Sequence, residues 1–126
     1  MNTLLPIVTN NTDRSMNSFV SNFKLVLGQV YWDEEITIPQ IAEQLNMDEV
    51  TLWRKVQKYC KTNPQLFLRN FRLDKSLQMF FDPEKSVSEI AHLSGFKSLQ
   101  HFSRVFKTRY GLSPNRYRSD QRYLNG

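Results

Sequence analysis

The chain has 126 residues, a net charge of +5, an apolar content of 40% and a charged content of 23%. This length suits one domain, or two small ones that share a core, and the apolar content argues against wholesale disorder. No apolar run reaches the roughly 18 residues of a membrane span, and the start "MNTLLPIVTNNTDR" is a poor secretory signal. Cys60 is the only cysteine, so an intrachain disulfide is excluded, which fits a reducing cytoplasm.

Charge is distributed unevenly along the sequence. Residues 1–50 contain two basic and seven acidic residues, a net charge of −5, whereas residues 51–126 contain 15 basic and five acidic residues, a net charge of +10. A polyanion is the natural partner of the basic part, although a merely solvated basic surface would show the same excess.

Spacing and punctuation predict an all-α protein of seven helices, since strand-like alternation is nowhere sustained. Residues 1–16 are expected to form a flexible tail or the end of a linker. A first helix is predicted over 17–31, where apolar residues recur at helical spacing. Thr37 is the expected N-cap of a short second helix, and Asp48 is that of a third helix over 49–60.

A long fourth helix is predicted over 64–81. Pro64 suits a first helical position, and Asp82-Pro83 stops the helix. The apolar stripe between them is wide, as is typical of a helix buried on two sides.

The last three predicted helices are short. Ser86 and Glu89 form a capping-box pattern at the start of the fifth helix, and Gly95 ends it. Ser98 is the expected cap of a sixth helix over about 99–109. A seventh is predicted from about residue 114 to 117, followed by a second flexible tail.

Two segments of the chain match each other. "IAEQLNMDEVTLWRKVQKYCKTNPQLF" aligns with "IAHLSGFKSLQHFSRVFKTRYGLSPNRY", at an offset of 49 residues before the turn and 50 after it. Each copy is a short helix, a tight turn and a second helix, which is the helix-turn-helix plan. The duplicated pair with basic outer faces favours DNA binding much more than a single pair would.

The outward sides of the two second helices carry the candidate DNA contacts. A Gln side chain can bridge two atoms on an adenine edge, and an Arg side chain can bridge two atoms on a guanine edge. Val50 suits contact with a thymine methyl group. Glu49 is interpreted as an acceptor for a cytosine amino group, and His101 as a residue facing solvent or a phosphate. Lys107, one turn further along, is expected to contact a phosphate.

Two longer segments resemble the AraC/XylS family of bacterial transcription regulators. "SVSEIAHLSGFKSLQHFSRVFKTRYGLSPNRYR" resembles its second motif, and "ITIPQIAEQLNMDEVTLWRKVQKYCKTNPQLFLRNFRL" its first motif and linker helix. The resemblance covers about 17–118 and implies homeodomain-like helices entering successive major grooves, about 34 Å apart. It transfers base-contacting roles to Val50, Trp53, Arg54, Leu99, Gln100, Ser103 and Arg104. The expected contacts to the DNA backbone come from Gln57, Lys58, Ser98 and Lys107.

The resemblance also implies a domain organisation and partners. The expected parts are a tail (1–16), a first helix-turn-helix subdomain (17–62), a linker helix (63–82), a second subdomain (83–118) and a tail (119–126). A double-stranded DNA operator and RNA polymerase are the implied partners, with no membrane and no cofactor. Asn46 stands where many members have glycine, but asparagine tolerates the left-handed conformation that the turn needs.

Family members usually carry a sensory domain, for which about 16 residues before the first helix are too few. "LWRKVQ" resembles the C-terminal output domains of hybrid two-component regulators. The chain is therefore expected to be either such an output domain, with a sensory domain N-terminal to it in a longer protein, or a stand-alone small regulator.

The sequence bears on two other classes of function. An enzyme is not expected, because the sequence shows no zinc-ligand spacing, phosphate-binding glycine loop or nucleophile elbow. The serious alternative is a helical protein-interaction module such as an anti-activator, whose surface would expose apolar anchors rather than Gln, Ser and Arg.

Overall fold

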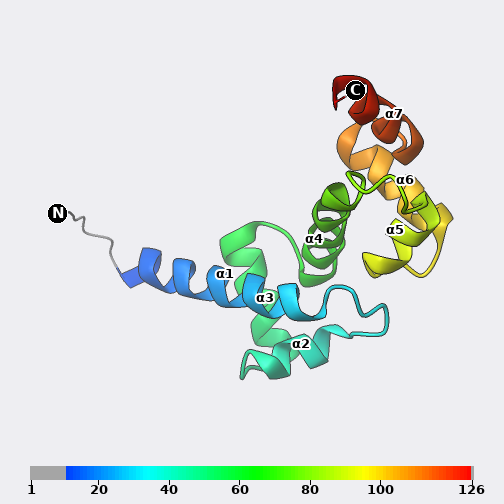
Figure 1. Ribbon diagram of the computed structural model, residues 1–126. Coiled ribbons are helices and arrows are strands. Elements are labelled where there is room, and N and C mark those ends of the chain that lie inside the picture. Colours follow the sequence, from blue (N-terminus) through cyan, green and yellow to red (C-terminus); the bar gives the residue numbers. More distant parts are fainter. Residues whose placement is uncertain (1–10, 126) are drawn as a thin grey trace. The chain divides into compact units, whose positions relative to one another are not determined.

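The computed structural model describes residues 11–125, with side chains placed for residues 14–121. Within that part of the chain the structure contains helices and no strands, which confirms the all-α prediction (Figure 1). The helices are α1 (Asn11–Val30), α2 (Ile38–Gln44), α3 (Glu49–Cys60), α4 (Pro64–Met79), α5 (Val87–Leu93), α6 (Leu99–Tyr110) and α7 (Pro114–Asn125). None of the described helices is both long and apolar enough to cross a membrane.

Side-chain caps begin the short helices where the sequence predicts them. Thr37 accepts a hydrogen bond from the Gln40 backbone N–H at 3.3 Å, and the Gln40 side chain accepts one from Thr37 N at 3.0 Å. Ser86 and Glu89 form the same reciprocal pair at the start of α5. These boxes satisfy backbone donors that a helix start leaves without intrahelical partners.

The first and last helices are longer than predicted. α1 begins at Asn11 rather than at residue 17, because a polar sequence can form helical turns ahead of the apolar stripe. α7 continues to Asn125 rather than ending near residue 117. Arg118 of α7 donates to the backbone carbonyl of Lys85, a contact between distant parts of the chain that local sequence patterns do not reveal.

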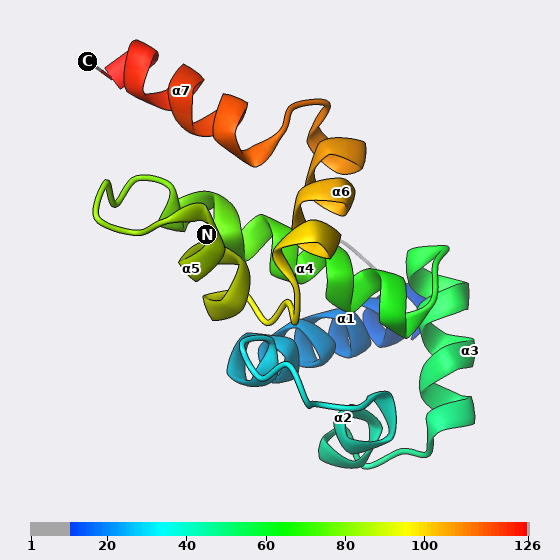
Figure 2. The same cartoon turned by 90° about the vertical axis from the view of Figure 1, so that its right-hand side faces the viewer.

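The described residues divide into two compact units. The N-terminal unit comprises residues 11–29 and 37–64, and the C-terminal unit comprises residues 30–36 and 65–125. Each contains one helix pair of the internal repeat, α2 with α3 and α5 with α6 (Figure 2). The five-part domain scheme expected from the sequence stays a prediction.

The core of the N-terminal unit is built mainly from aliphatic residues. In α3, Leu52 and Val56 are fully buried, and the small Ala42 of α2 is buried as well, which lets the two helices approach closely. The buried apolar residues of this unit include Phe19, Phe23, Leu27, Ile38, Ile41, Ala42, Leu52, Val56 and Pro64.

The core of the C-terminal unit combines aliphatic residues with four buried phenylalanines, Phe80, Phe96, Phe102 and Phe106. The rings of Phe102 and Phe106 in α6 are 5.4 Å apart, and Phe96 from the preceding turn contacts Phe102 edge-on at 5.1 Å. Phe80, near the end of α4, lies 5.7 Å from Phe106. Such pairs add a geometric preference to the burial of large apolar areas, so α6 is held in one orientation by its inner face.

A close backbone approach anchors the turn between α5 and α6. Arg72 of α4 donates from Nε to the carbonyl of Tyr31 and from Nη2 to that of Asp33, both at 2.8 Å. Gly95 lies against this contact with φ of +92°, and a Cβ there would stand 2.1 Å from the Tyr31 carbonyl oxygen. Glycine is therefore required at residue 95 for both conformation and space.

Candidate nucleic-acid interface

The two helix-turn-helix copies have the same turn. The backbone N–H of Met47 donates to the Ala42 carbonyl at 3.1 Å, and that of Phe96 donates to the Ala91 carbonyl at 3.0 Å. The residue before each donor is left-handed, with φ of 60° at Asn46 and 92° at Gly95, which confirms the prediction for Asn46.

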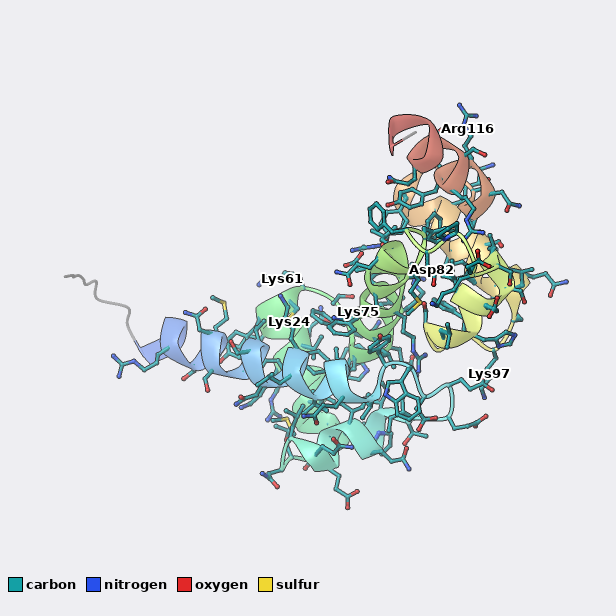
Figure 3. The ribbon with its side chains drawn as sticks, in the orientation of Figure 1. Lys24, Lys61, Lys75, Asp82, Lys97 and Arg116 are labelled. Carbon is teal, nitrogen blue, oxygen red and sulfur yellow. The ribbon has the colours of Figure 1, made fainter. Side chains whose placement is uncertain are left out.

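The single-residue difference in length falls directly after this shared turn. The extra residue is Lys97, whose exposed side chain extends away from the ribbon (Figure 3). Its Nζ lies 3.5 Å from a Glu35 carboxylate oxygen of the same unit. The insertion therefore leaves the hydrogen bonds of the turn unchanged.

Each expected recognition helix begins at a side-chain cap. Asp48 Oδ1 accepts from the Thr51 N–H at 2.7 Å, and this bond is the main reason that the pKa of the Asp48 carboxyl lies below its usual value. Ser98 Oγ accepts from the His101 N–H at 3.1 Å. Its O–H can still donate, so the cap is compatible with the expected contact from Ser98 to the DNA backbone.

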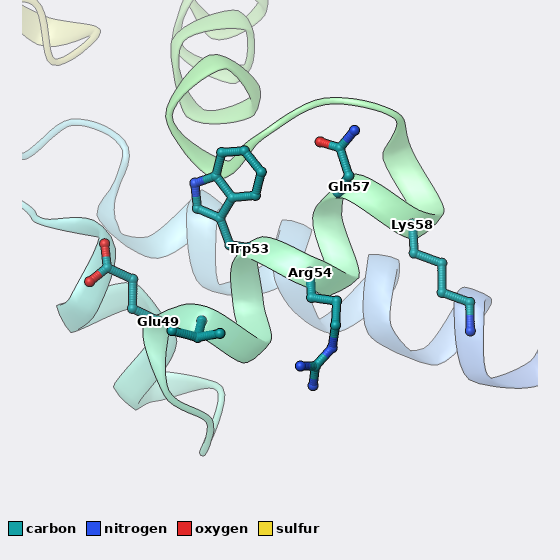
Figure 4. Close-up of a pocket in the computed structure, with 6 residues that line it drawn as sticks. Glu49, Trp53, Arg54, Gln57 and Lys58 are labelled. Atoms are coloured by element: carbon teal, nitrogen blue, oxygen red, sulfur yellow. The ribbon is translucent and has the colours of Figure 1, made fainter.

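The predicted contacts of the first motif lie together on the exposed face of α3 (Figure 4). A shallow hollow on this helix is lined by Glu49, Val50, Trp53, Arg54, Gln57 and Lys58. Val50 is 70% exposed and Trp53 is 46% exposed, so much of this face is apolar. The opposite face carries the buried residues, and α3 is therefore anchored with its candidate contacts outward.

The predicted contacts of the second motif lie on the outer side of α6. Leu99, Gln100, Arg104 and Lys107 are exposed, whereas Ser103 is half-buried at the edge of this face. The inner face consists of Phe102, Val105 and Phe106, all buried. The short helix has an aromatic face and a polar face because one packs against the core and the other stays in water.

A histidine contacts one of these candidate residues. Arg104 Nη2 lies 2.9 Å from His101 Nδ1, three residues earlier in the same helix. Since a guanidinium has donors and no acceptor, the imidazole nitrogen must be the acceptor. Partial burial lowers the pKa of His101 from its ordinary value, and the charges of Arg104 and Arg69 lower it further. The sequence interpretation of His101 missed this contact, although a spacing of three residues is the usual signal for it.

Part of the positive charge in the C-terminal unit is paired within the unit. Arg109 donates to the Asp74 carboxylate from Nε at 3.2 Å and from Nη2 at 3.1 Å, and the Tyr110 hydroxyl donates to the same carboxylate. Partial burial and this carboxylate raise the pKa of Tyr110. Arg109 therefore fastens the end of α6 to α4.

No metal centre was found among the residues that the structure describes. Groups of three or more His, Cys, Asp and Glu side chains close enough to hold an ion are absent from that part of the chain. Cys60 is a half-buried thiol whose pKa is raised by burial, the opposite of what an activated nucleophile requires.

Comparison with known proteins gives matches across most of the chain. Residues 41–120 match a family described as "Helix-turn-helix domain". The transcriptional activator RhaS of Escherichia coli O139:H28 is 28% identical over 116 residues, which cover 90% of this chain and 42% of RhaS. The chain thus spans less than half the length of this relative.

Solved structures of similar fold cover about four-fifths of the chain. The C-terminal domain of AraT, a response regulator from Geobacillus stearothermophilus, is 26% identical, with a TM-score of 0.70 over 80% of this chain and 83% of that domain. The DNA-binding domain of the transcriptional factor AdpA, solved with a target DNA, is 21% identical, with a TM-score of 0.74 over 83% of this chain and 93% of that one.

Proposed function

The chain belongs to the AraC family of helix-turn-helix proteins, and from that premise we propose that it binds double-stranded DNA at specific sequences and regulates transcription. The description of RhaS as a transcriptional activator supports a regulatory role rather than an enzymatic one. The observation that carries the proposal is the presence of two equivalent capped helices, each anchored by a buried face and each exposing hydrogen-bonding and cationic side chains.

The proposed base contacts follow from the chemistry of the exposed side chains. Arg54 and Arg104 can each present two N–H donors to the O6 and N7 atoms of a guanine. Gln100 can pair in the same bidentate way with an adenine, and Val50 can contact a thymine methyl group. Trp53, Leu99 and Ser103 complete the proposed reading surfaces, the first two by apolar contact with base edges.

The proposed backbone contacts position the helices without reading sequence. Lys58 and Lys107 are exposed cations one turn beyond the arginines of their helices, where a phosphate is the nearer target. Gln57 and Ser98 can donate to phosphate oxygens from neutral groups. The two helices are proposed to enter successive major grooves, about one helical turn apart.

The remaining partners belong to the same proposal. Regulation of transcription would bring the bound chain to RNA polymerase in a bacterial cytoplasm. A sensory domain would precede this chain in a longer protein, since the matched relative RhaS is more than twice as long as the aligned segment.

One observation favours a second candidate function, a protein-interaction module. The hollow on α3 exposes Val50 and Trp53, which are the apolar anchors that a protein interface would use. DNA binding remains the better explanation, because α6 carries the polar residues Gln100 and Ser103 at the equivalent positions.

Selection of bound duplexes from a random library, followed by a salt titration, tests the proposal. We expect a defined sequence to be enriched, and its affinity to fall steeply and linearly on logarithmic axes as salt rises. Recovery of no preferred duplex, even at low ionic strength, would overturn the proposal in favour of the interaction module.

A further inference from the structure

Arg104 and its counterpart Arg54 occupy equivalent positions in the repeat but have different surroundings. An offset of 50 residues aligns the two arginines, and it aligns His101 with Thr51. In the second motif His101 Nδ1 accepts a hydrogen bond from Arg104 at 2.9 Å. In the first motif Thr51 lies over the Asp48 cap, to which its backbone N–H donates.

We propose that His101 is a positioning residue that holds the Arg104 guanidinium ready to read a base, and so sets the sequence specificity of α6. This inference rests on the proposed function, because it assumes that Arg104 contacts a base edge. A long side chain that is ordered before binding loses less rotamer freedom when it docks. This smaller entropy cost favours only those duplexes on which the guanidinium binds a base in its ordered position.

The surroundings of His101 favour the form that can accept a hydrogen bond. Its ring lies 5.8 Å from the buried Phe96 ring, centroid to centroid, which limits the orientation of the imidazole. The backbone N–H of His101 donates to the Ser98 cap, which fixes the backbone from which the ring extends. The charges that act on the ring are those of Arg104 in the same helix and Arg69 in α4. Both are positive, so both oppose protonation of His101 and keep Nδ1 available as an acceptor.

Lowering the pH should break the hydrogen bond between Arg104 and His101. As pH falls through the pKa of His101, which lies below the ordinary 6.5, Nδ1 takes up a proton and can no longer accept from Arg104. The two like charges then repel each other. A protonated imidazole also attracts phosphate, so affinity for an arbitrary duplex should be maintained or rise while discrimination falls. This opposite movement distinguishes positioning from general electrostatic attraction.

The test measures affinity for two duplexes at two pH values. The probes are the duplex that the wild-type chain selects from a random library and a scrambled duplex of the same composition. Fluorescence anisotropy with the whole chain gives the ratio of the two affinities. We expect His101→Ala to lower this ratio by about two- to tenfold, from the rotamer freedom of one long side chain. His101→Asn, whose side-chain oxygen can replace Nδ1 as the acceptor, should restore most of it.

The pH dependence of this ratio distinguishes positioning from a structural effect, because a loss of packing would not produce it. Between about pH 8 and pH 5 we expect the wild-type ratio to fall and the His101→Asn ratio to stay constant, because asparagine does not titrate in that range. In an Arg104→Ala background, His101→Ala should change nothing further, since the positioned group is absent. Thr51→Ala is the matched control in the first motif and should leave the ratio unchanged.

Three results would overturn the inference while leaving the proposed function intact. One is that wild type and His101→Ala show the same ratio of affinities for the selected and scrambled duplexes. The second is an equal loss of affinity for both duplexes, which would make His101 a phosphate contact. The third is a full effect of His101→Ala in the Arg104→Ala background. If instead the chain selects no duplex, the proposed function fails.

Discussion

The two helix-turn-helix motifs share a backbone design but differ in the side chains on both faces of their second helices. The turn hydrogen bond, the left-handed residue and the side-chain cap recur in each copy. On the inner face Leu52 and Val56 correspond to Phe102 and Phe106, and on the outer face Val50 and Trp53 correspond to Gln100 and Ser103. Arginine is kept at Arg54 and Arg104. The comparison indicates that turn and cap chemistry maintain the fold, while the outer face is available for different sequence readout.

The largest expected difference between the copies lies in their cores. Phe106→Ala should lower the free energy of unfolding by about 3–5 kcal/mol, because it removes a fully buried ring that contacts four others. Val56→Ala, at the equivalent position, should cost about 2 kcal/mol, since only two buried methyl groups are lost. Urea unfolding of each variant measures this. Equal losses would show that the aromatic core of the C-terminal unit adds nothing to its packing.

The turns should differ next. Gly95→Ala should destabilise the fold by about 3 kcal/mol, from left-handed strain together with the collision of the new Cβ with the Tyr31 carbonyl. Asn46→Ala, in the other copy, should cost about 1 kcal/mol through the strain alone. Thermal and urea unfolding provide the comparison, with Asn46→Gly as a control that relieves the strain and should not destabilise. Similar losses at the two alanine variants would contradict the close approach at residue 95.

The shared arginines allow a binding test. Arg104→Ala should weaken binding to the selected duplex by about 1–3 kcal/mol and relax the preference at a single base pair. Affinities for duplexes substituted at each base pair, measured by anisotropy, would reveal the relaxed position. A uniform loss on every sequence would instead indicate a phosphate contact.

The smallest expected effect distinguishes the residues one turn beyond the arginines. Lys107→Ala should weaken all duplexes alike and reduce the slope of log affinity against log salt by about one, because one phosphate contact is lost. Gln57→Ala, at the equivalent position in α3, removes a neutral group and should leave that slope unchanged. Salt titrations of the two variants against wild type make the comparison. Loss of preference at one base in Lys107→Ala would place that lysine in the groove instead.

The fold was largely predictable from the sequence because the residues that begin and end its helices act through local contacts. Thr37, Asp48, Ser86 and Ser98 are short polar residues whose side chains reach the backbone of the next turn, so their capping roles depend on few other residues. The extension of α7 was missed because its second half, "RSDQRYLN", is largely polar and shows no apolar stripe. A contact that ties this part of α7 to a distant segment joins Arg118 to the backbone carbonyl of Lys85, 33 residues away. Contacts at that range leave no periodic signal in the helix itself.

The exposed positions of the candidate interface were also predictable from the sequence. The exposed positions of α3 and α6 follow from helical periodicity once the buried face is assigned, as Leu52 and Phe102 show. The contact between His101 and Arg104 was not predicted, because a spacing of three residues permits such a pair without requiring it. Side-chain rotamers decide whether the pair forms, and those depend on neighbours such as Phe96.

The central claim is that the outer faces of α3 and α6 read different parts of one DNA site. A base-substitution scan of the selected duplex, made in parallel with Arg54→Ala and Arg104→Ala, tests it most directly. We predict that each variant loses discrimination at its own base pair, with the two positions separated by about one helical turn of 10 base pairs. Loss at the same position, or within the same half-site, would contradict the claim.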